Sequence, residues 1–540
     1  MASADGKTIT FKLRTGVHWS DGKPFTSADA LWTFNSVLHN KTNQLHSTID
    51  GVTSVSAPDA TTFVLHLATR DSEFLDKLAI PILPAHVWSK YPLAKLDKVD
   101  GPIPTVTTAP FMLTTWEKNG TTILTRNDRY DVFRNGGKLP QVKRVLITYY
   151  ANPDGVYRDV SQGNLDIGYG GPVQWARRAK QDKNPKVELV SSPRGGYWEI
   201  AFNSCPAGGS TICTGPGKNV KVKVVQDLAI RQAIAYAVDR EKLIPTIYDG
   251  QGVTAYSLIS PRFARYFVDR KDEPLGYAFD PAKAKATLAA GGWDCATTPC
   301  VKNGVKAQFE LLTLSSSPQF QRLAKRVAAD ARKVGIVIDL SFASEDAVNN
   351  RIYASGSKKD TYAPNFDAFL WDWDVGGTTP TPIMEVLKSD NSSSDSFFAS
   401  KQFDADLQRA KEATTPAATV AAVRDAEAVA LRKLPYLPLV HLNNIEIARL
   451  DTWHGWAPSP ARTGAILFET QQQFLTLAPG PAPSSGSSTP VAAVGRSSDG
   501  WLTTPRALLI GFALLAASIL ASAHLASGRR RVEPLEWTEE

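Results

Sequence analysis

Two acidic side chains stand between two tryptophans in the stretch "FDAFLWDWDVGG", residues 366–377. The stretch is apolar, rich in aromatic residues and closed by two glycines, which predicts a strand that enters a loop. Successive side chains of a strand point to opposite faces, so Asp372 and Asp374 share one face while Trp371 and Trp373 share the other. The two carboxylates could hold a metal ion, hold the positive charge of a ligand, or lie in solvent.

The spacing of the two aspartates is similar to the Asp-x-Asp pair that holds a metal nucleotide in some glycosyltransferases. The sequence has no Rossmann fingerprint, no phosphate-binding loop, no His-Glu-x-x-His and no Gly-x-Ser-x-Gly elbow to support an enzyme. We therefore predict a protein that is not an enzyme and that uses neither a cofactor nor a metal.

The composition is that of a folded protein with more than one core. A chain of 540 residues exceeds what one hydrophobic core usually serves, so two or three lobes are expected. The apolar fraction is 43% and the charged fraction is 21%, which excludes a disordered chain. The net charge of +7 is spread along the chain, and its densest pieces, "RRAKQDKNPK" and "KNVKVK", lack interleaved aromatics, so we expect no nucleic-acid partner.

The four cysteines form two local couples, Cys205 with Cys213 and Cys295 with Cys300. Four cysteines allow three connectivities, and the short Gly- or Pro-containing loops favour a bridge within each couple. A zinc site is the alternative, but neither couple has the two-residue spacing of a zinc knuckle. Disulfides would indicate an oxidising compartment.

The C-terminal region predicts a membrane anchor. Residues 507–527, "ALLIGFALLAASILASAHLAS", are long enough to cross a bilayer as a helix, and "GRRR" follows them directly. By the positive-inside tendency the short tail is cytoplasmic and the large N-terminal part faces outward. A buried core helix is the alternative, but it would not explain the Pro-, Gly- and Ser-rich stretch of residues 478–500 that precedes it.

The first residues, "MASADGKTITFKLR", contain no charged and apolar regions of a signal peptide. Because "TITFKL" alternates like a strand, we expect the chain to begin inside a domain, through truncation or a misplaced start.

The elements that must position these residues alternate between strands and helices, which predicts α/β or α+β lobes. In "FDPAKAKATLAAGG" a helix is expected after the N-cap Asp280, and it should end at Gly291. In "SSPQFQRLAKRVAADARKVG" apolar residues recur along one helical face, and the strand "IVIDLSF" should follow. Thr26 and Asp29 predict a capping box before a third helix.

Taken together, these segments resemble the peptide/nickel group of substrate-binding proteins that serve bacterial ABC importers, the dipeptide- and oligopeptide-binding proteins among them. The resemblance runs in family order over most of residues 8–455. It is carried by "FKLRTGVHWSDGKPFTSADALWTF", "TRNDRYD", "GNLDIG", "DLAIRQAIAYAVDREKLI", "FDPAKAKATLAAGGW", "LAKRVAADARKVGIVIDL" and "RKLPYLPLVH".

The resemblance implies an α/β fold: a two-lobed periplasmic-binding-protein-like clamshell of type II with a third subdomain, to which we add one C-terminal transmembrane helix. Such a clamshell encloses its ligand when the lobes close about a hinge. The implied parts are an N-terminally truncated third subdomain belonging to lobe I (1–104), lobe I (105–220 and 445–477) and lobe II (221–444). The C-terminal sequence adds a linker (478–504), the transmembrane helix (505–528) and a cytoplasmic tail (529–540).

The resemblance also implies a ligand site. Relatives that bind peptides place an aspartate three residues after a tryptophan, where it pairs with the α-ammonium group, and Trp371 and Asp374 match that spacing. Tyr197 and Trp198 in "GGYWEIAFN" occupy the corresponding strand of the first lobe, where alternation should place one of the two in the core. Trp19 matches a structural position rather than a site.

Two departures from the family pattern bear on the ligand. The opening strands of the family are absent, and Ala368 stands where peptide binders often carry a basic group. Arg351 and Lys359 are the nearest basic residues, and both are expected in loops. The ligand is therefore expected to be longer than a dipeptide, or not a peptide.

The sequence thus predicts a membrane-tethered, extracytoplasmic solute-binding component of an ABC importer. Its partners would be an oligopeptide-like ligand, the permease and the ATPase subunits. A sensor or structural ectodomain with the same clamshell is the second hypothesis, because a C-terminal span is an unusual attachment. A metal-dependent glycosyltransferase-like enzyme, in which Asp372 and Asp374 would be the Asp-x-Asp pair, is the third.

Overall fold

A computed structural model describes residues 1–39, 49, 51–78, 80–91, 106–116, 120–130, 138–150, 152–205, 210, 212–217, 220–358, 361–456 and 472–481. The predicted transmembrane helix (505–528) and tail (529–540) lie outside these residues. Within the described ranges no helix is both long enough and apolar enough to cross a membrane.

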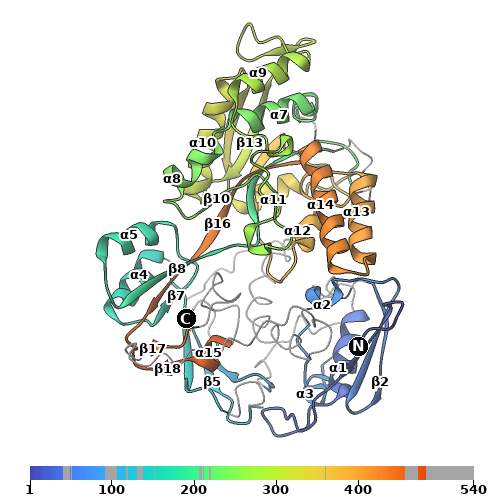
Figure 1. Ribbon diagram of the computed structural model, residues 1–540, viewed down its shortest axis with the longest axis vertical. Helices are drawn as coiled ribbons and strands as arrows, with labels where there is room; N and C mark the ends of the chain where they lie inside the picture. The colour runs from blue at the N-terminus through green and yellow to red at the C-terminus, as the bar shows by residue number, and fades with distance from the viewer. Residues whose placement is uncertain are drawn as a thin grey trace, which may run out of the picture.

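The largest sheet has eight strands and runs through the middle of the molecule (Figure 1). Its order is β10-β16-β9-β15-β13-β14, and β7 and β8 also pair with β16. The strands are β7 (Ile167–Gly168), β8 (Val187–Pro193), β9 (Tyr197–Phe202), β10 (Gly252–Thr254), β13 (Gln308–Leu314), β14 (Val337–Ala343), β15 (Ala368–Trp373) and β16 (Tyr436–Arg449).

Helices cover both faces of this sheet, which explains why its central strands are apolar on both sides. One core cluster packs the first helix group against the sheet, and a second cluster packs the other group against the opposite face. The first group is α7 (Leu228–Ala237), α8 (Leu243–Ile247), α9 (Pro281–Ala290) and α10 (Pro318–Arg332), and the second is α11 (Glu345–Ile352), α12 (Thr381–Glu385), α13 (Lys401–Glu412) and α14 (Pro416–Lys433).

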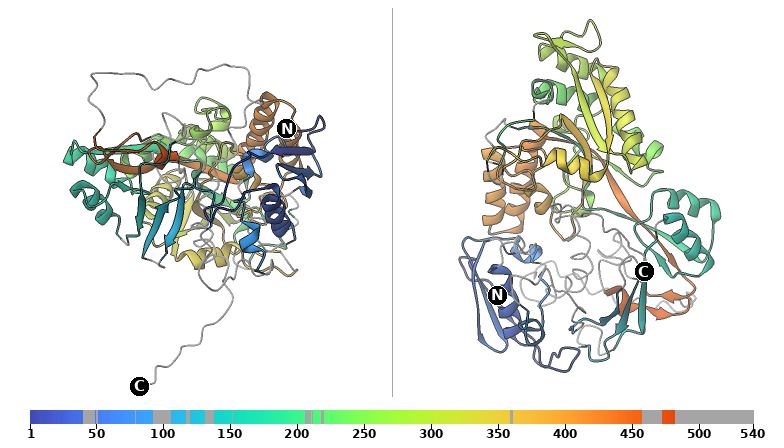
Figure 2. Two further views of the ribbon diagram at one scale, coloured as in Figure 1. Left: turned by 90° about the horizontal axis from the view of Figure 1, so that it is seen from below. Right: turned by 180° about the vertical axis from the view of Figure 1, so that it is seen from behind.

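The long strand β16 joins two parts of the molecule. Its first half pairs with β9 and β10, and its second half pairs with β8 and β7. In Figure 2 it runs from the part that carries α10 to the part that carries α4 (Pro153–Gln162) and α5 (Gln174–Asp182). Residues 194–196 connect β8 to β9 beside it, so two neighbouring chain segments cross between the parts.

Two three-stranded sheets lie outside the central one. The N-terminal sheet, in the order β1-β3-β2, packs with α1 around its own apolar cluster, and a second sheet has the order β4-β5-β6. Their elements are β1 (Thr8–Lys12), α1 (Ser27–Leu38), β2 (Val52–Asp59), β3 (Thr62–Leu67), α2 (Phe74–Lys77), α3 (Ala85–Trp88), β4 (Phe111–Thr115), β5 (Thr121–Arg126) and β6 (Arg144–Thr148).

The remaining described elements are short. They are α6 (Val222–Val225), β11 (Val301–Lys302), β12 (Val305–Lys306), β17 (Trp453–His454), α15 (Gln472–Thr476), β18 (Ala478–Pro479), and the 3-10 turns Arg240–Lys242, Pro261–Phe263 and Pro274–Gly276. Because β18 pairs with β17, the first residues of the predicted linker belong to a sheet, and a tether can begin only after them. The other domain boundaries stay predictions.

The local elements that the sequence predicts are confirmed. Asp280 caps α9 through a hydrogen bond to the amide of Lys283, and Gly291 ends the helix. The capping box of Thr26 and Asp29 is present before α1. The strand expected after α10 is β14, and α10 buries the predicted apolar face, Phe320, Leu323, Val327 and Ala331.

The members of each cysteine couple lie close together. The Cα atoms are 5.9 Å apart for Cys205 and Cys213 and 4.2 Å apart for Cys295 and Cys300. The structure therefore places the local partners as the sequence predicts.

Candidate functional site

Strand β15 positions the two aspartates. It runs between β13 and β9, and its antiparallel register with β9 sets Asp372 opposite Trp198 and Trp373 opposite Tyr197. Residues opposite each other in such a pair share a face. One face of the strand pair therefore carries Asp372 with Trp198, and the other face carries Trp373 with Tyr197.

An arginine that the sequence analysis missed meets both aspartates. Arg194 follows β8, and its Nε donates a hydrogen bond to Oδ2 of Asp374 over 2.8 Å. Its Nη2 lies 3.7 Å from Oδ2 of Asp372. All three side chains are partly exposed, with fractions of 30%, 35% and 26% for Arg194, Asp374 and Asp372. The two carboxylates thus share one guanidinium at the surface of the molecule.

The backbone of Arg194 forms hydrogen bonds with β16 and with Ser260. Its amide donates to the carbonyl oxygen of Leu442 in β16 over 3.0 Å. Its carbonyl oxygen accepts a hydrogen bond from Oγ of Ser260 over 2.5 Å. The backbone is therefore anchored, while the side chain reaches across to the end of β15.

Two glycines bring this segment against the loop that carries Asp374. A Cβ on Gly195 would lie 1.9 Å from the carbonyl oxygen of Val375, and a Cβ on Gly196 would lie 1.5 Å from that of Trp373. No side chain fits at such distances, so the close approach of residues 195–196 to residues 373–375 requires glycine. This contact fixes the position of Arg194 relative to the aspartates.

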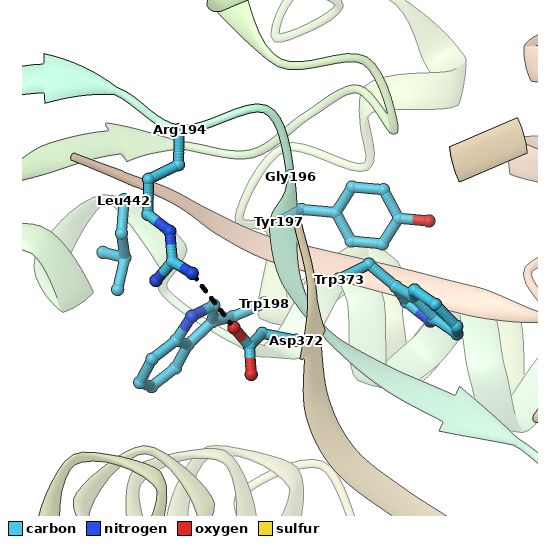
Figure 3. Close-up of a pocket in the computed structure, with 7 residues that line it drawn as sticks. All are labelled: Arg194, Gly196, Tyr197, Trp198, Asp372, Trp373 and Leu442. Atoms are coloured by element: carbon cyan, nitrogen blue, oxygen red, sulfur yellow. Dashed lines mark ion pairs between the residues drawn. The ribbon is translucent and has the colours of Figure 1, made fainter. Parts of the chain in front are cut away.

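A small pocket lies at this junction (Figure 3). Its volume is about 150 Å³, including space that is open to solvent. In the close-up, Arg194, Leu442, Trp198 and Asp372 lie on one side of the strands, and Tyr197 and Trp373 point to the other side. The pocket is lined by Arg194, Gly196, Tyr197, Trp198, Asp372, Trp373 and Leu442.

Trp198 forms a rigid wall of this pocket. Its ring stacks on Phe320 with centroids 4.0 Å apart and meets Tyr248 edge-on at 5.4 Å. The side chain is 7% exposed, so its packing rather than solvent sets its orientation. A rigid aromatic wall beside carboxylates suits a cationic group with apolar surface.

Burial changes the acidity of Asp372. It raises the pKa of this carboxyl to about 6, an effect that Arg194 opposes and that Asp374 and Glu345 reinforce. Asp372 therefore loses its negative charge at a mildly acidic pH.

Behind the strands lies a second acidic group. Asp395, between α12 and α13, accepts hydrogen bonds from the hydroxyl of Tyr436 and, over 3.0 Å, from Nε1 of Trp373. Burial raises the pKa of Asp395 to about 7, although both donors lower it. Trp373 thus belongs to the pocket lining at its strand position, while its ring points to the other side of the strands and meets this buried carboxyl.

Glu199 in β9 belongs to the same buried side. It is fully buried, and neither of its carboxyl oxygens has a hydrogen-bond partner within the described part of the chain. Burial, reinforced by Asp395 and Asp372, raises the pKa of Glu199 well above its usual range. The hydroxyl of Tyr197 also lacks a partner among the described residues. These side chains form an uncharged polar layer behind the pocket.

Most predicted site residues come together here, with exceptions. Asp372, Trp373, Tyr197 and Trp198 all line the pocket, and Asp374 holds Arg194 at its edge. Both Tyr197 and Trp198 are buried, on opposite faces of β9. Trp371 packs against the core cluster on the far side, with its ring 6.4 Å from that of Phe369, and does not line the pocket.

The two basic residues that the sequence offered do not supply the positive charge. Arg351 was expected in a loop, but it lies in α11 and forms an ion pair with Glu310. Lys359 lies outside the described residues. The stretch "SSPRGGYW" held the missed signal, because an arginine and two glycines precede a strand of the same sheet. Only the pairing of β9 with β15 turns this signal into a contact with the aspartates.

Among the described residues, no group of three or more His, Cys, Asp or Glu side chains is arranged to hold a metal ion. The site instead combines two carboxylates, one guanidinium and an aromatic wall. It can accept a cationic group on the carboxylates.

Comparison with known proteins finds similarity over most of the chain. The chain is 27% identical over 455 residues to protein XP55 of Streptomyces lividans, covering 84% of this chain and 76% of that protein. It is 29% identical over 364 residues to a putative ABC transporter peptide-binding protein of Brucella ovis, covering 67% of this chain but only 62% of that protein.

Among solved structures, the fold is similar to that of the oligopeptide-binding protein AppA from Bacillus subtilis in complex with a nonapeptide. The TM-score is 0.67 at 21% identity, with 89% of this chain and 88% of that chain covered. The expected mixed α/β architecture of binding proteins is thereby confirmed.

The sequence profile of one family covers residues 2–395, well over half of the chain. Because the match extends over more than half of the chain, the chain belongs to the bacterial extracellular solute-binding proteins, family 5.

Proposed function

We propose that this chain is the extracytoplasmic solute-binding component of an ABC importer and that it binds an oligopeptide-like ligand through the ligand's ammonium group. Family membership and the names of the relatives support import and a peptide ligand. The observation that carries the proposal is the pairing of two carboxylates beside an aromatic wall, with Asp374 at the end of β15.

The proposed anchor is Asp374, with Asp372 as a second acceptor. A ligand ammonium that leaves water must be paired, because an unpaired buried charge is costly. A carboxylate meets it with a directional, charge-assisted hydrogen bond. Trp198 would supply apolar contact, Tyr197 and Trp373 would support the wall from the other side of the strands, and Trp371 would act through packing.

The test uses trialanine as a defined peptide and N-acetyl-trialanine as its uncharged counterpart. By calorimetry, the wild-type full-length chain should bind trialanine and bind the acetylated peptide far more weakly. Asp374→Asn keeps the shape and removes the charge, so it should cost about 2–5 kcal/mol, or about thirtyfold or more in affinity for trialanine. It should change binding of the acetylated peptide much less, because the coupled partner is already gone.

Asp390→Asn is the matched control, since Asp390 is 63% exposed and pairs with Lys388 away from the pocket. It should bind both peptides as the wild type does. Equal binding of both peptides by the wild type, or no binding of either, would contradict recognition of an ammonium group. Mass spectrometry of small molecules that co-purify with the chain would then identify the ligand class directly.

The proposal includes a membrane tether and two disulfides. The apolar residues 507–527 and the arginines after them support a single span with the N-terminal part outside. The close cysteine couples support bridges between Cys205 and Cys213 and between Cys295 and Cys300. External protease on intact cells should release the large N-terminal part, and protection of that part would refute this orientation.

A further inference from the structure

The pocket contains more negative than positive charge. Asp372 and Asp374 carry one carboxylate each, and Arg194 offers them a single guanidinium. The guanidinium donates a hydrogen bond to Asp374 over 2.8 Å but approaches Asp372 only to 3.7 Å, beyond hydrogen-bond distance. One carboxylate is well paired and the other is only electrostatically screened.

The guanidinium lies where a cationic ligand group would have to lie. Oδ2 of Asp374 accepts the hydrogen bond of Arg194, so an ammonium that binds this oxygen must compete with that bond. Arg194 also lines the pocket, and its side chain is the movable part of a residue whose backbone is anchored to Leu442 and Ser260. The guanidinium of Arg194 thus carries the positive charge, and makes the hydrogen bond to Asp374, that a cationic ligand would need.

We propose that Arg194 is a built-in competitor for the cation subsite: its guanidinium occupies Asp374 and Asp372 in the empty protein, and a ligand binds by displacing it. The identity of the natural ligand in this inference rests on the proposed function. The test below uses a defined cation and does not depend on that identity. Two neighbouring carboxylates without a counter-ion repel each other, so the arginine stabilises the empty site. Because a ligand cation must displace the Arg194 guanidinium, a cation that interacts only weakly with the carboxylates does not bind.

The sign of one measurement separates this role from the obvious alternative. If Arg194 were part of the ligand's binding surface, removing it would weaken binding. If Arg194 competes, Arg194→Met frees the carboxylates and strengthens the binding of cations. Methionine keeps an unbranched apolar stem in the pocket and removes the charge.

The probe is n-propylguanidinium chloride, which carries the same charged group as the arginine side chain. Thermal shift and calorimetry on the full-length chain, with sodium chloride adjusted to equal ionic strength, should show about tenfold tighter binding to Arg194→Met than to the wild type. The double variant Arg194→Met with Asp374→Asn should lose this gain, because the subsite no longer carries its main acceptor. The near-ultraviolet circular dichroism of each variant reports whether the fold is intact.

Arg177→Met is the matched control. Arg177 in α5 forms a comparable ion pair, with Nη2 2.7 Å from Oδ1 of Asp249, but it is 60% exposed and does not line the pocket. This variant should respond to the probe as the wild type does. A gain in Arg177→Met as large as that in Arg194→Met would overturn the proposal, because it would show general charge attraction.

The outcomes also distinguish this inference from the proposed function. If trialanine fails to bind the wild type while Arg194→Met gains affinity for propylguanidinium, the competitor role holds and the peptide proposal fails. If trialanine binds and Arg194→Met weakens it as Asp374→Asn does, then Arg194 contacts the ligand and the competitor role is refuted. An equal or weaker response of Arg194→Met to propylguanidinium refutes it as well.

Discussion

Acidic side chains lie on both faces of β9 and β15, and their surroundings differ. Asp372, with Asp374 just beyond the strand, meets the guanidinium of Arg194 where solvent still reaches. Asp395 and Glu199 lie on the other side, fully or nearly fully buried, and within the described part of the chain neither takes part in an ion pair. Asp395 has hydrogen-bond donors, whereas Glu199 has none among the described residues.

The difference shows how one sheet can carry charge on one face and suppress it on the other. A carboxylate beside an arginine and water keeps its charge and can recognise a cation. A buried carboxyl without a cation is more stable in its neutral form, which acts as packing and as a hydrogen-bond partner. The first face is suited to binding, and the second supports it.

The sharpest test of the buried face is Asp395→Ala. The change leaves the hydroxyl of Tyr436 and Nε1 of Trp373 without their acceptor, so it should lower the free energy of unfolding by about 2–4 kcal/mol. Urea denaturation measures this loss. The exposed control Asp390→Ala should stay within about 0.5 kcal/mol of the wild type. If Asp395→Ala lowers the free energy of unfolding no more than the control does, the hydrogen bonds of Asp395 add no more to stability than an exposed side chain does.

The pH dependence of stability tests the exposed face. The raised pKa of Asp372, about 6 instead of 3.8, means that the folded state favours the neutral carboxyl. Its contribution to stability is therefore complete below about pH 4 and is lost as the pH rises through about 6. Asp372→Asn should show no such loss, so from pH 4 to pH 8 it should gain about 2 kcal/mol on the wild type.

Urea denaturation of both proteins at pH 4, 6 and 8 gives the comparison. Arg194, Asp374 and Glu345 are the charged groups that influence Asp372, and they are the same in both proteins. Stability curves that run parallel between pH 4 and pH 8 would contradict the raised pKa. The exposed face would then carry more charge, and the two faces would differ more, than the structure indicates.

The smallest effect is expected for Glu199→Gln. Because burial keeps this carboxyl neutral, an amide of nearly the same shape should change the free energy of unfolding by less than about 1 kcal/mol at pH 4, where the carboxyl is also largely protonated in the unfolded chain. Chemical denaturation measures the change. A stabilisation of several kcal/mol at pH 4 would show that Glu199 is charged in the folded protein, which would make the two faces alike.

Local sequence patterns are sufficient to predict the helices and strands described above and to predict which side chains of a strand share a face. Alternation in "FLWDWD" predicts that aspartates and tryptophans point to opposite sides, and Trp371 and Trp373 do pack on the side away from Arg194. Caps such as Asp280 and the apolar face of α10 are equally local, because the residues that decide them are within a few positions of each other. Motifs in family order were enough to indicate the family and its fold.

Tertiary structure alone decided what the aspartates meet. Arg194 is separated from Asp374 by 180 residues, so no local pattern links them. Their contact depends on the pairing of β9 with β15 and on Gly195 and Gly196, which let the two segments touch. The packing of α11 beside β13 places Arg351 against Glu310 instead of in the site. The core clusters on the two faces of β9 bury both Tyr197 and Trp198. Charge pairing and burial are set by which distant segments meet, and that information is carried by the packing of the whole chain rather than by any short stretch of it.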